Sequence, residues 1–219
     1  MSTLATPGRR RGSPGAARRR GRPPGSTSDA TRTRILRAAR GCFARRGYAS
    51  TTNHDIAGQA GITAAALYQY FDSKRALYMA TVHDAQAELL PRFRSAVRSA
   101  ASARDALRDL VLASVHLHES DASLAPFLSA LPVEMQRHAE IAEAMATEPS
   151  EIVTLVMEAV SRGVQSGEIA ETMAPGAVSM FLACTMGLSL YAATTSGGAL
   201  GPAVGAYASL IDGVLFGAG

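Results

Sequence analysis

Side chains that could support acid–base or metal chemistry are scattered through this sequence of 219 residues. His116 and His118 stand two positions apart, about 200° around a helix, so they cannot bind one metal ion as an i, i+4 pair can. The sequence lacks a Cys-x-x-Cys pair, a Gly-x-Ser-x-Gly motif and a glycine loop that would hold phosphates. Cys42 and Cys184 lie in separate apolar patterns typical of reduced core thiols. We therefore expect no enzyme activity, no metal site and no cofactor.

Polar residues with informative spacing lie instead within residues 47–77, GYASTTNHDIAGQAGITAAALYQYFDSKRAL. Thr52 stands three residues before Asp55, which is the spacing of a capping box at the start of a helix. Gly61 follows where a left-handed residue can end that helix, and Thr63 can cap the next one. The order helix, glycine turn, helix predicts a helix-turn-helix.

The second helix, expected over residues 63–71, has two unlike halves. At 100° per residue, one half is shallow and the other is bulky. A helix that enters the major groove needs a low outer face with a few polar side chains that reach base edges. The shallow half holds Ala64, Ala65, Tyr68 and Gln69, and the bulky half holds Ala66, Leu67, Tyr70 and Phe71.

At these positions the sequence resembles the DNA-binding domain of the TetR family of transcriptional repressors, over residues 30–80. Asn53 is a mild departure, because an apolar residue is commoner there. The resemblance implies an all-α protein, in which an N-terminal three-helix helix-turn-helix domain is followed by a larger helical ligand-binding and dimerisation domain. The shared residues are Gly47-Tyr48, Thr51-Thr52, Ile56-Ala57, Ala60-Gly61, Leu67-Tyr68, Tyr70-Phe71, Ser73-Lys74 and Leu77.

The resemblance also implies roles for single residues. Gln69 is suited to a bidentate bond with adenine, and the methyl groups of Ala64 and Ala65 could meet thymine methyl groups. The competing interpretation of the threonines is that they only cap helices. The implied phosphate contacts are Thr52, Tyr68, Tyr70 and Lys74, and the implied base-facing residues are His54, Thr63, Ala64, Ala65 and Gln69.

Charge divides the chain. Residues 1–80 carry 15 basic and 3 acidic side chains, whereas residues 81–219 carry 7 basic and 15 acidic ones. The basic part is suited to polyanions and the acidic part to regulation. We expect a disordered Arg-rich arm over 1–28, which either adds salt-dependent DNA affinity or only solubilises, then the DNA-binding domain over 29–77 and the effector and dimerisation domain over 78–219.

The first helix is expected to begin near Ser28 and end before Gly47. Most of its arginines, Arg40 among them, are expected on a solvated face, and the family resemblance implies a phosphate contact at the N-terminal end of this helix. Pro91 and Pro132 are expected to end or kink later helices, and no segment alternates with the period of a strand. The arm lacks the apolar run of a secretion signal, which favours a cytoplasmic address.

Residues 173–211 contain no charged side chain. Such a segment could form a membrane hairpin, or two helices that pack on the same pair of helices in a second subunit. Because Ser, Thr and Gly interrupt its apolar run, we expect the homodimer and no membrane span. The expected interface residues are Ala183, Gly187, Val204, Tyr207, Ile211 and Val214. The family resemblance implies that the space among the middle helices holds a small effector, and the few charges there favour an apolar or aromatic compound. The candidate residues, which are otherwise expected to be core, are Met79, Phe93, Leu112, Val115, His116, Phe127, Leu128, Met135, Met157 and Phe181.

Together these features predict a homodimeric, ligand-responsive transcriptional repressor that binds a palindromic double-stranded DNA operator. The alternative is a chromosome-associated protein that binds DNA without sequence preference through its Arg-rich arm.

Overall fold

The computed structural model describes residues 24–146, 150–194 and 200–215, without the side chains of residues 24–27, 115–120, 192–194, 214 and 215. The part of the chain that it describes is helical and contains no strand, which confirms the predicted all-α class. Most of the predicted arm, residues 1–23, lies outside the described residues. The helices are α1 (Pro24–Ser50), α2 (Asn53–Gln59), α3 (Ala64–Tyr68), α4 (Lys74–Ser99), α5 (Ala103–Ser120), α6 (Leu124–Arg137), α7 (Ala139–Ala146), α8 (Glu151–Ser166), α9 (Ala174–Thr194) and α10 (Leu200–Leu210), with a 3-10 turn (Glu171–Met173) before α9 and a π-helical turn (Ile211–Leu215) after α10.

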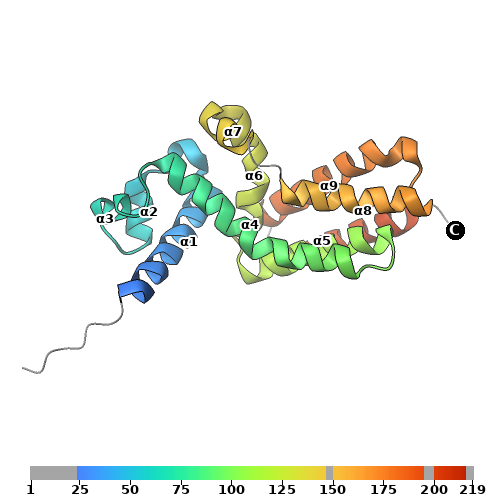
Figure 1. The fold of residues 1–219 in the computed structure, drawn as a ribbon, viewed down its shortest axis with the longest axis horizontal. Coiled ribbons are helices and arrows are strands. Elements are labelled where there is room, and N and C mark those ends of the chain that lie inside the picture. Colours follow the sequence, from blue (N-terminus) through green and yellow to red (C-terminus); the bar gives the residue numbers. More distant parts are fainter. Residues whose placement is uncertain (1–23, 147–149, 195–199, 216–219) are drawn as a thin grey trace, which may run out of the picture.

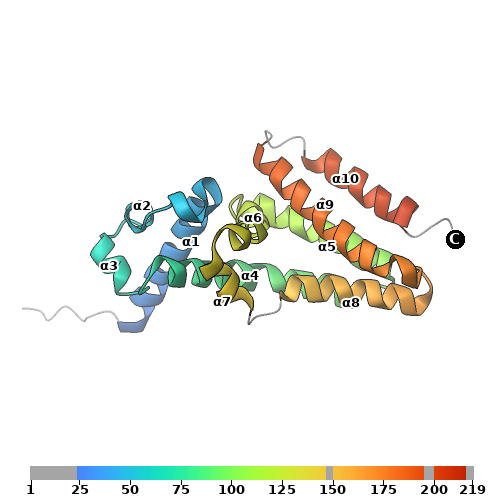
Figure 2. The same ribbon diagram turned by 90° about the horizontal axis from the view of Figure 1, so that it is seen from above.

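The helices form two groups joined by α4. Helices α1 to α3 lie at one end, and α5, α8, α9 and α10 form the bundle at the other end (Figure 1). Helix α6 stands between the groups, beside α1 and α4, and the same arrangement is visible from above (Figure 2). Helix α6 therefore lies against both groups of helices.

Four helix ends differ from the prediction. Helix α1 begins at Pro24, and it continues to Ser50 through a break at Gly47, where φ is 74°. A Cβ atom at Gly47 would lie 2.8 Å from Oε1 of Glu134, so this turn requires glycine both for its backbone angle and for the close approach. Pro91 and Pro132 lie inside α4 and α6 and do not end them. Both prolines are exposed while buried side chains lie on the other faces of their helices, so packing offsets the missing hydrogen bond.

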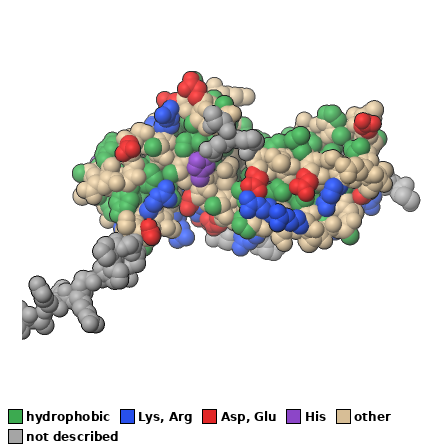
Figure 3. Space-filling view, in the orientation of Figure 1, with side chains coloured by type: hydrophobic (Ala, Val, Ile, Leu, Met, Phe, Trp, Pro, Cys, Tyr) green, Lys and Arg blue, Asp and Glu red, His purple; other side chains and the backbone are tan. Residues whose placement is uncertain are grey.

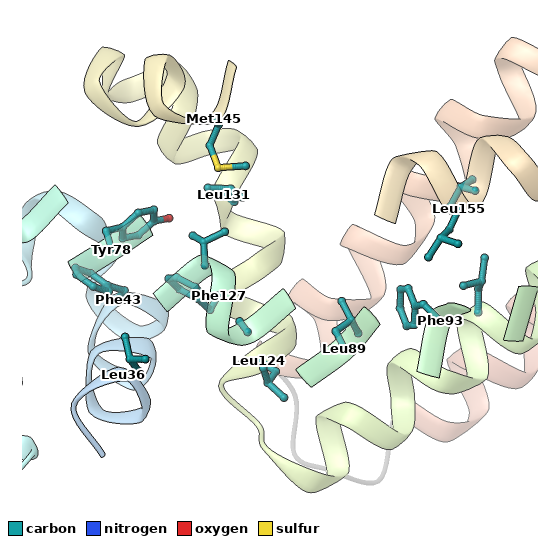
Figure 4. Close-up of a cluster of buried hydrophobic side chains, with 14 of the residues drawn as sticks. Leu36, Phe43, Tyr78, Leu89, Phe93, Leu124, Phe127, Leu131, Met145 and Leu155 are labelled. Atoms are coloured by element: carbon teal, nitrogen blue, oxygen red, sulfur yellow. The ribbon is translucent and has the colours of Figure 1, made fainter. Parts of the chain in front are cut away.

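An aromatic cluster joins α1, α4 and α6. The rings of Phe43 and Tyr78 are 4.9 Å apart and edge to face, and those of Tyr78 and Phe127 are 5.4 Å apart. Figure 4 shows these three rings converging from the three helices. All three side chains are at most 2% exposed, so this cluster is the core between the two groups of helices.

A buried guanidinium lies at one end of this cluster. Arg40 is 1% exposed, so the prediction of a solvated face for it was wrong. Its Nε donates to the hydroxyl of Ser123 at 3.1 Å, and its two other nitrogens donate to Glu88 at 3.0 Å and to Asp121. Burial raises the pKa of Asp121, but hydrogen bonds from Ser123 and the charge of Arg40 outweigh burial and leave that pKa below its ordinary value. Arg40 thus ties α1 to α4 and to the turn before α6.

A second polar contact closes the other end. The backbone N–H of Tyr48 donates to Oε1 of Glu134 at 3.1 Å, and Glu134 is 7% exposed. Nε2 of His138 lies 3.2 Å from Oε2 of the same carboxylate, and the His138 ring meets the Tyr48 ring edge-on at 5.1 Å. The Tyr48 hydroxyl donates to Glu140 on α7. Helix α6 is therefore held against α1 near both of its ends, with the aromatic cluster between.

Removal of the buried Arg40 charge should destabilise the protein, because its carboxylate partners lose their cation. An Arg40→Met variant leaves the carboxylates of Glu88 and Asp121, and that of Asp84 at 3.8 Å from Arg40, without their cation, so the free energy of unfolding should fall by about 2–4 kcal/mol. Arg37, exposed on the same helix, supplies the control, because Arg37→Met should change stability by less than about 0.5 kcal/mol. Urea unfolding at one fixed protein concentration measures both. Equal stability of the two variants would contradict the structural role assigned to Arg40.

Candidate nucleic-acid interface and ligand cavity

Helices α2 and α3 are fixed by the local signals that the sequence contains. Thr52 and Asp55 form both bonds of the predicted capping box, and Arg46 pairs with Asp55 at 3.0 Å. The Thr52 hydroxyl and backbone N–H, followed by Arg46, lower the pKa of Asp55 to about 2. Gly61 has a φ of 66°, as expected of the residue that ends α2, and Thr63 accepts the N–H of Ala66 at 3.1 Å.

Helix α3 is shorter than predicted. It covers Ala64–Tyr68, and Gln69 forms its C-cap with an N–H that bonds to the carbonyl groups of Ala66 and Leu67. Its exposed side bears Ala65, Tyr68 and Gln69, with Tyr68 53% exposed. The opposite side carries Leu67, which is fully buried. The short helix therefore presents a low surface that ends in two longer side chains with polar groups.

The other predicted DNA contacts lie around this surface. Thr52, His54 and Thr63 are exposed at the starts of α2 and α3, beside backbone N–H groups that favour anions. Ala64 and Tyr70 are half-buried against the core, so Tyr70 packs its ring as helical geometry indicated. Their roles as DNA contacts stay predictions.

Lys74 has a position that the sequence did not indicate. Its ammonium group donates to the carbonyl oxygens of Tyr48 at 2.9 Å, Ala49 at 3.2 Å and Thr51 at 3.3 Å, and it lies 4.5 Å from the centroid of the Tyr48 ring. All three donors of the ammonium group are thereby used. Lys74 caps the end of α1 and fixes the start of α4 to it, and its predicted phosphate contact stays untested.

A cavity of about 360 Å³ lies within the bundle. It is bounded by side chains of α4, α5, α6, α7, α8 and α9, and the part of the chain that the structure describes contributes no charged side chain to its lining. Hydroxyl and amide groups supply the polar part of the wall. Those polar residues are Gln86, Ser114, Ser129, Ser150, Thr185 and Ser189. The cavity suits the apolar part of a ligand.

Three of the predicted pocket residues, Phe93, Leu128 and Met135, line this cavity. The others with described side chains lie elsewhere: Phe127 is in the aromatic cluster, Phe181 packs on Tyr207, Met79 packs against the core, and Leu112 and Met157 are 40% and 56% exposed. The side chains of Val115 and His116 lie outside the described residues.

The sequence analysis placed one residue of α9, Phe181, in the pocket, but the residues of α9 that line the cavity are Leu182, Thr185, Met186 and Ser189. This helix is apolar on all sides, so its pattern alone does not distinguish a pocket face from an interface face.

The outer faces of α9 and α10 form an uncharged surface at the edge of the molecule (Figure 2). Of the predicted interface residues, Ala183 and Gly187 are exposed on this surface, but Val204, Tyr207 and Ile211 are buried inside the subunit. The Tyr207 hydroxyl donates to the carbonyl of Phe181 at 3.3 Å, which shows that this face of α10 packs on α9. The side chain of Val214 lies outside the described residues. The exposed large side chains of this surface are Met180, Leu190, Tyr191 and Leu210.

Within the described residues, one helical stretch, Glu171–Tyr191, has the length and composition of a membrane span, with a mean hydropathy of 1.5. Only 11% of its apolar window is buried in the subunit. Length and composition alone are weak support for a span, and an exposed apolar surface of this kind also marks contact with another protein.

Comparison with known proteins agrees with the helix-turn-helix geometry. The model of the family described as bacterial regulatory proteins, tetR family, matches residues 35–81. The transcriptional activator FasR of Mycolicibacterium smegmatis is 37% identical over 124 residues, which are 55% of each chain. The transcriptional repressor KstR2 of Rhodococcus jostii is 37% identical over 83 residues, 38% of this chain and 41% of the relative. The chain thus spans about half the length of the curated relatives it matches.

A solved structure extends the likeness of fold to most of the chain. The transcriptional regulator FadR from Bacillus subtilis, solved in complex with stearoyl-CoA, has a TM-score of 0.70 and 20% identity, and the match covers 82% of this chain and 96% of that one. The helix-turn-helix geometry and the family match lead to one assignment: residues 35–81 form a DNA-binding domain of the tetR family of bacterial regulatory proteins, in a chain whose fold resembles that of a solved transcriptional regulator.

Proposed function

We propose that the protein is a homodimeric, sequence-specific transcriptional repressor that leaves its operator when an apolar effector binds. The observation that carries this proposal is the surface of α3, whose exposed Tyr68 and Gln69 follow a shallow alanine face on a helix that α1 and α2 support. Occupying an operator represses a promoter without any further contact, so this function needs only the surfaces described above.

DNA contact divides between position and sequence. The capped starts of α2 and α3 bring exposed backbone N–H groups and the Thr52 and Thr63 side chains toward phosphates, which fixes the register. Gln69 reads adenine by a bidentate bond, and Tyr68 adds a phosphate contact. In a dimer the two α3 helices meet half-sites about 34–36 Å apart, or a multiple of that distance.

The effector is assigned to the cavity from its lining. A wall without charges favours an apolar ligand, and the structurally similar FadR was solved with stearoyl-CoA. We assign this chain an effector of the same class, an acyl thioester whose hydrocarbon part enters the cavity.

Helix α6 provides the link between cavity and DNA. Leu128 and Met135 of α6 line the cavity, while Glu134 on the same helix accepts the N–H of Tyr48 just before α2. A ligand that shifts α6 therefore acts on the support of the reading helix. A preference of about 3 kcal/mol for the shifted form weakens operator binding on the order of 100-fold.

The uncharged face of α9 and α10 is assigned to the homodimer. Its exposed apolar side chains and small residues allow close packing on the same face of a second subunit, which supplies the two-fold symmetry of a palindromic operator. A protein that acts on operators in this way works in the cytoplasm, without a membrane span.

Sequence-specific binding through α3 is tested by selecting bound duplexes from random DNA at about 0.15 M salt. A Tyr68→Ala and Gln69→Ala double variant should lose roughly 10- to 100-fold in affinity for the selected palindrome, because it loses a base contact and a phosphate contact. Met157→Ala, at an exposed position on α8, should bind as the wild type does. If the wild type and the double variant both retain DNA of no common sequence, the chromosome-associated alternative replaces the repressor.

The dimer assignment predicts a concentration-dependent change of mass without detergent. Leu190→Glu or Leu210→Glu should weaken the dimer by at least about tenfold, because each leucine buries apolar surface worth about 1.5–3 kcal/mol. Met157→Glu adds the same charge at a side chain of similar exposure and should leave the dimer intact. Sedimentation velocity measures all three variants. A wild type that sediments as a monomer, or that partitions with membranes after lysis, would refute the assignment.

A further inference from the structure

Three arginines cluster on α4 in the otherwise acidic part of the chain. Residues 81–219 contain seven basic side chains, and Arg92, Arg94 and Arg98 are three of them, with no acidic residue from Pro91 to Ser99. Arg94 and Arg98 line an open groove on this face of α4, together with Ser95 and Ser99. Figure 3 shows basic side chains gathered beside a few acidic ones on this half of the molecule. The groove therefore offers the two guanidinium groups and the Ser95 hydroxyl to an anion, whereas the Ser99 hydroxyl donates to the carbonyl of Ser95 at 2.7 Å.

The groove adjoins the apolar cavity. Phe93 lines the cavity and directly precedes Arg94. Figure 4 shows the Phe93 ring near Leu155 of α8. On α8, Glu151 stands between Ser150 and Ile152, which both line the cavity. NH2 of Arg94 donates to Oε2 of Glu151 at 2.7 Å, so one ion pair crosses from α4 to α8 at the rim of the cavity.

The charges at this rim are available to a ligand. The Arg94 and Glu151 side chains are 41% and 40% exposed, and an ion pair in such a position is worth only about 0–1 kcal/mol. Arg98 forms no ion pair with the described residues, although its charge contributes, after the hydrogen bonds of Arg94, to the lowered pKa of Glu151. A phosphate, with more charge and more acceptor oxygens than a carboxylate, can replace Glu151 as the partner of these arginines.

We propose that the groove formed by Arg94, Ser95, Arg98 and Ser99 binds the phosphate-bearing head of an effector whose apolar tail fills the adjoining cavity. This inference rests on the proposed function, because it concerns the effector assigned there. The cavity lining has no charge with which to hold an anionic head, so the head lies outside it, and the rim at Arg94 is the charged border that the structure describes. The Arg94–Glu151 pair then acts as a competitor that the head must displace.

The test measures binding to the full-length protein by isothermal titration calorimetry, with palmitoyl-CoA, palmitate and a lysophosphatidic acid with a palmitoyl chain, each below its micelle concentration. An Arg94→Gln and Arg98→Gln double variant should lose on the order of 10- to 100-fold in affinity for palmitoyl-CoA, because it loses charge-assisted hydrogen bonds. Its affinity for palmitate should change far less. Arg137→Gln removes one arginine charge from an exposed position at the end of α6 and should bind all probes as the wild type does.

A second variant has the opposite expected sign. Glu151→Gln removes the competing carboxylate, so palmitoyl-CoA should bind several-fold more tightly, an outcome that general damage to the fold would not produce. Equal palmitoyl-CoA binding by wild type and both variants would overturn the groove alone. If the wild type binds none of the three probes, the acyl class of the proposed function is wrong as well. Arginine-dependent binding of lysophosphatidic acid but not of palmitoyl-CoA would support the groove and replace the thioester with a phospholipid.

Discussion

The buried guanidinium of Arg40 is the interaction on which the arrangement of this protein depends. A charge that is 1% exposed must find partners, and Arg40 finds them on α4 and in the turn that precedes α6. At the same interface of α1, α4 and α6, the aromatic rings of Phe43, Tyr78 and Phe127 pack against one another. At the far end of the same interface, Glu134 accepts the N–H of Tyr48. Along this interface the residue numbers of the contacts increase on α1 and on α6 together. The two helices therefore run in the same direction and are fixed along their shared length.

This constraint is the physical basis of the proposed link between the cavity in one group of helices and the surface of α3 in the other. Helix α6 contributes one face to the cavity and another to α1, and it has little freedom to move on one side alone. Lys74 adds a third tie, because it caps the last carbonyl groups of α1 from the first turn of α4. A displacement of α6 or α4 therefore alters the contacts of Tyr48, which lies four residues before Thr52, the N-cap of α2. Packed interfaces of this kind switch between discrete arrangements more readily than they deform.

The sequence predicted the local features well and the distant contacts poorly, for a physical reason. Thr52, Gly61 and Thr63 act within a few residues of their own position, so the helix-turn-helix is visible in the chain itself. Arg40 appeared solvated because its partners lie 48 and 81 residues away, and Pro91 appeared to end α4 because the packing that carries the helix through it is tertiary. The pocket was only partly predicted, because large residues such as Phe127 are equally suited to a core. In α10, Val204 and Tyr207 form an apolar stripe that packs inward, whereas the exposed face consists of smaller residues apart from Leu210.

The most direct test of signal transmission through α6 is the hydrogen-exchange rate of the Tyr48 amide, measured by NMR with and without the acyl effector. This amide donates to Glu134, and it therefore reports whether α6 stays on α1. If α6 transmits the signal, the effector speeds hydrogen exchange at Tyr48, and the effector weakens operator binding over the same range of concentration. If the effector releases the operator while exchange at Tyr48 stays unchanged or slows, α6 does not transmit the signal and the central claim is wrong.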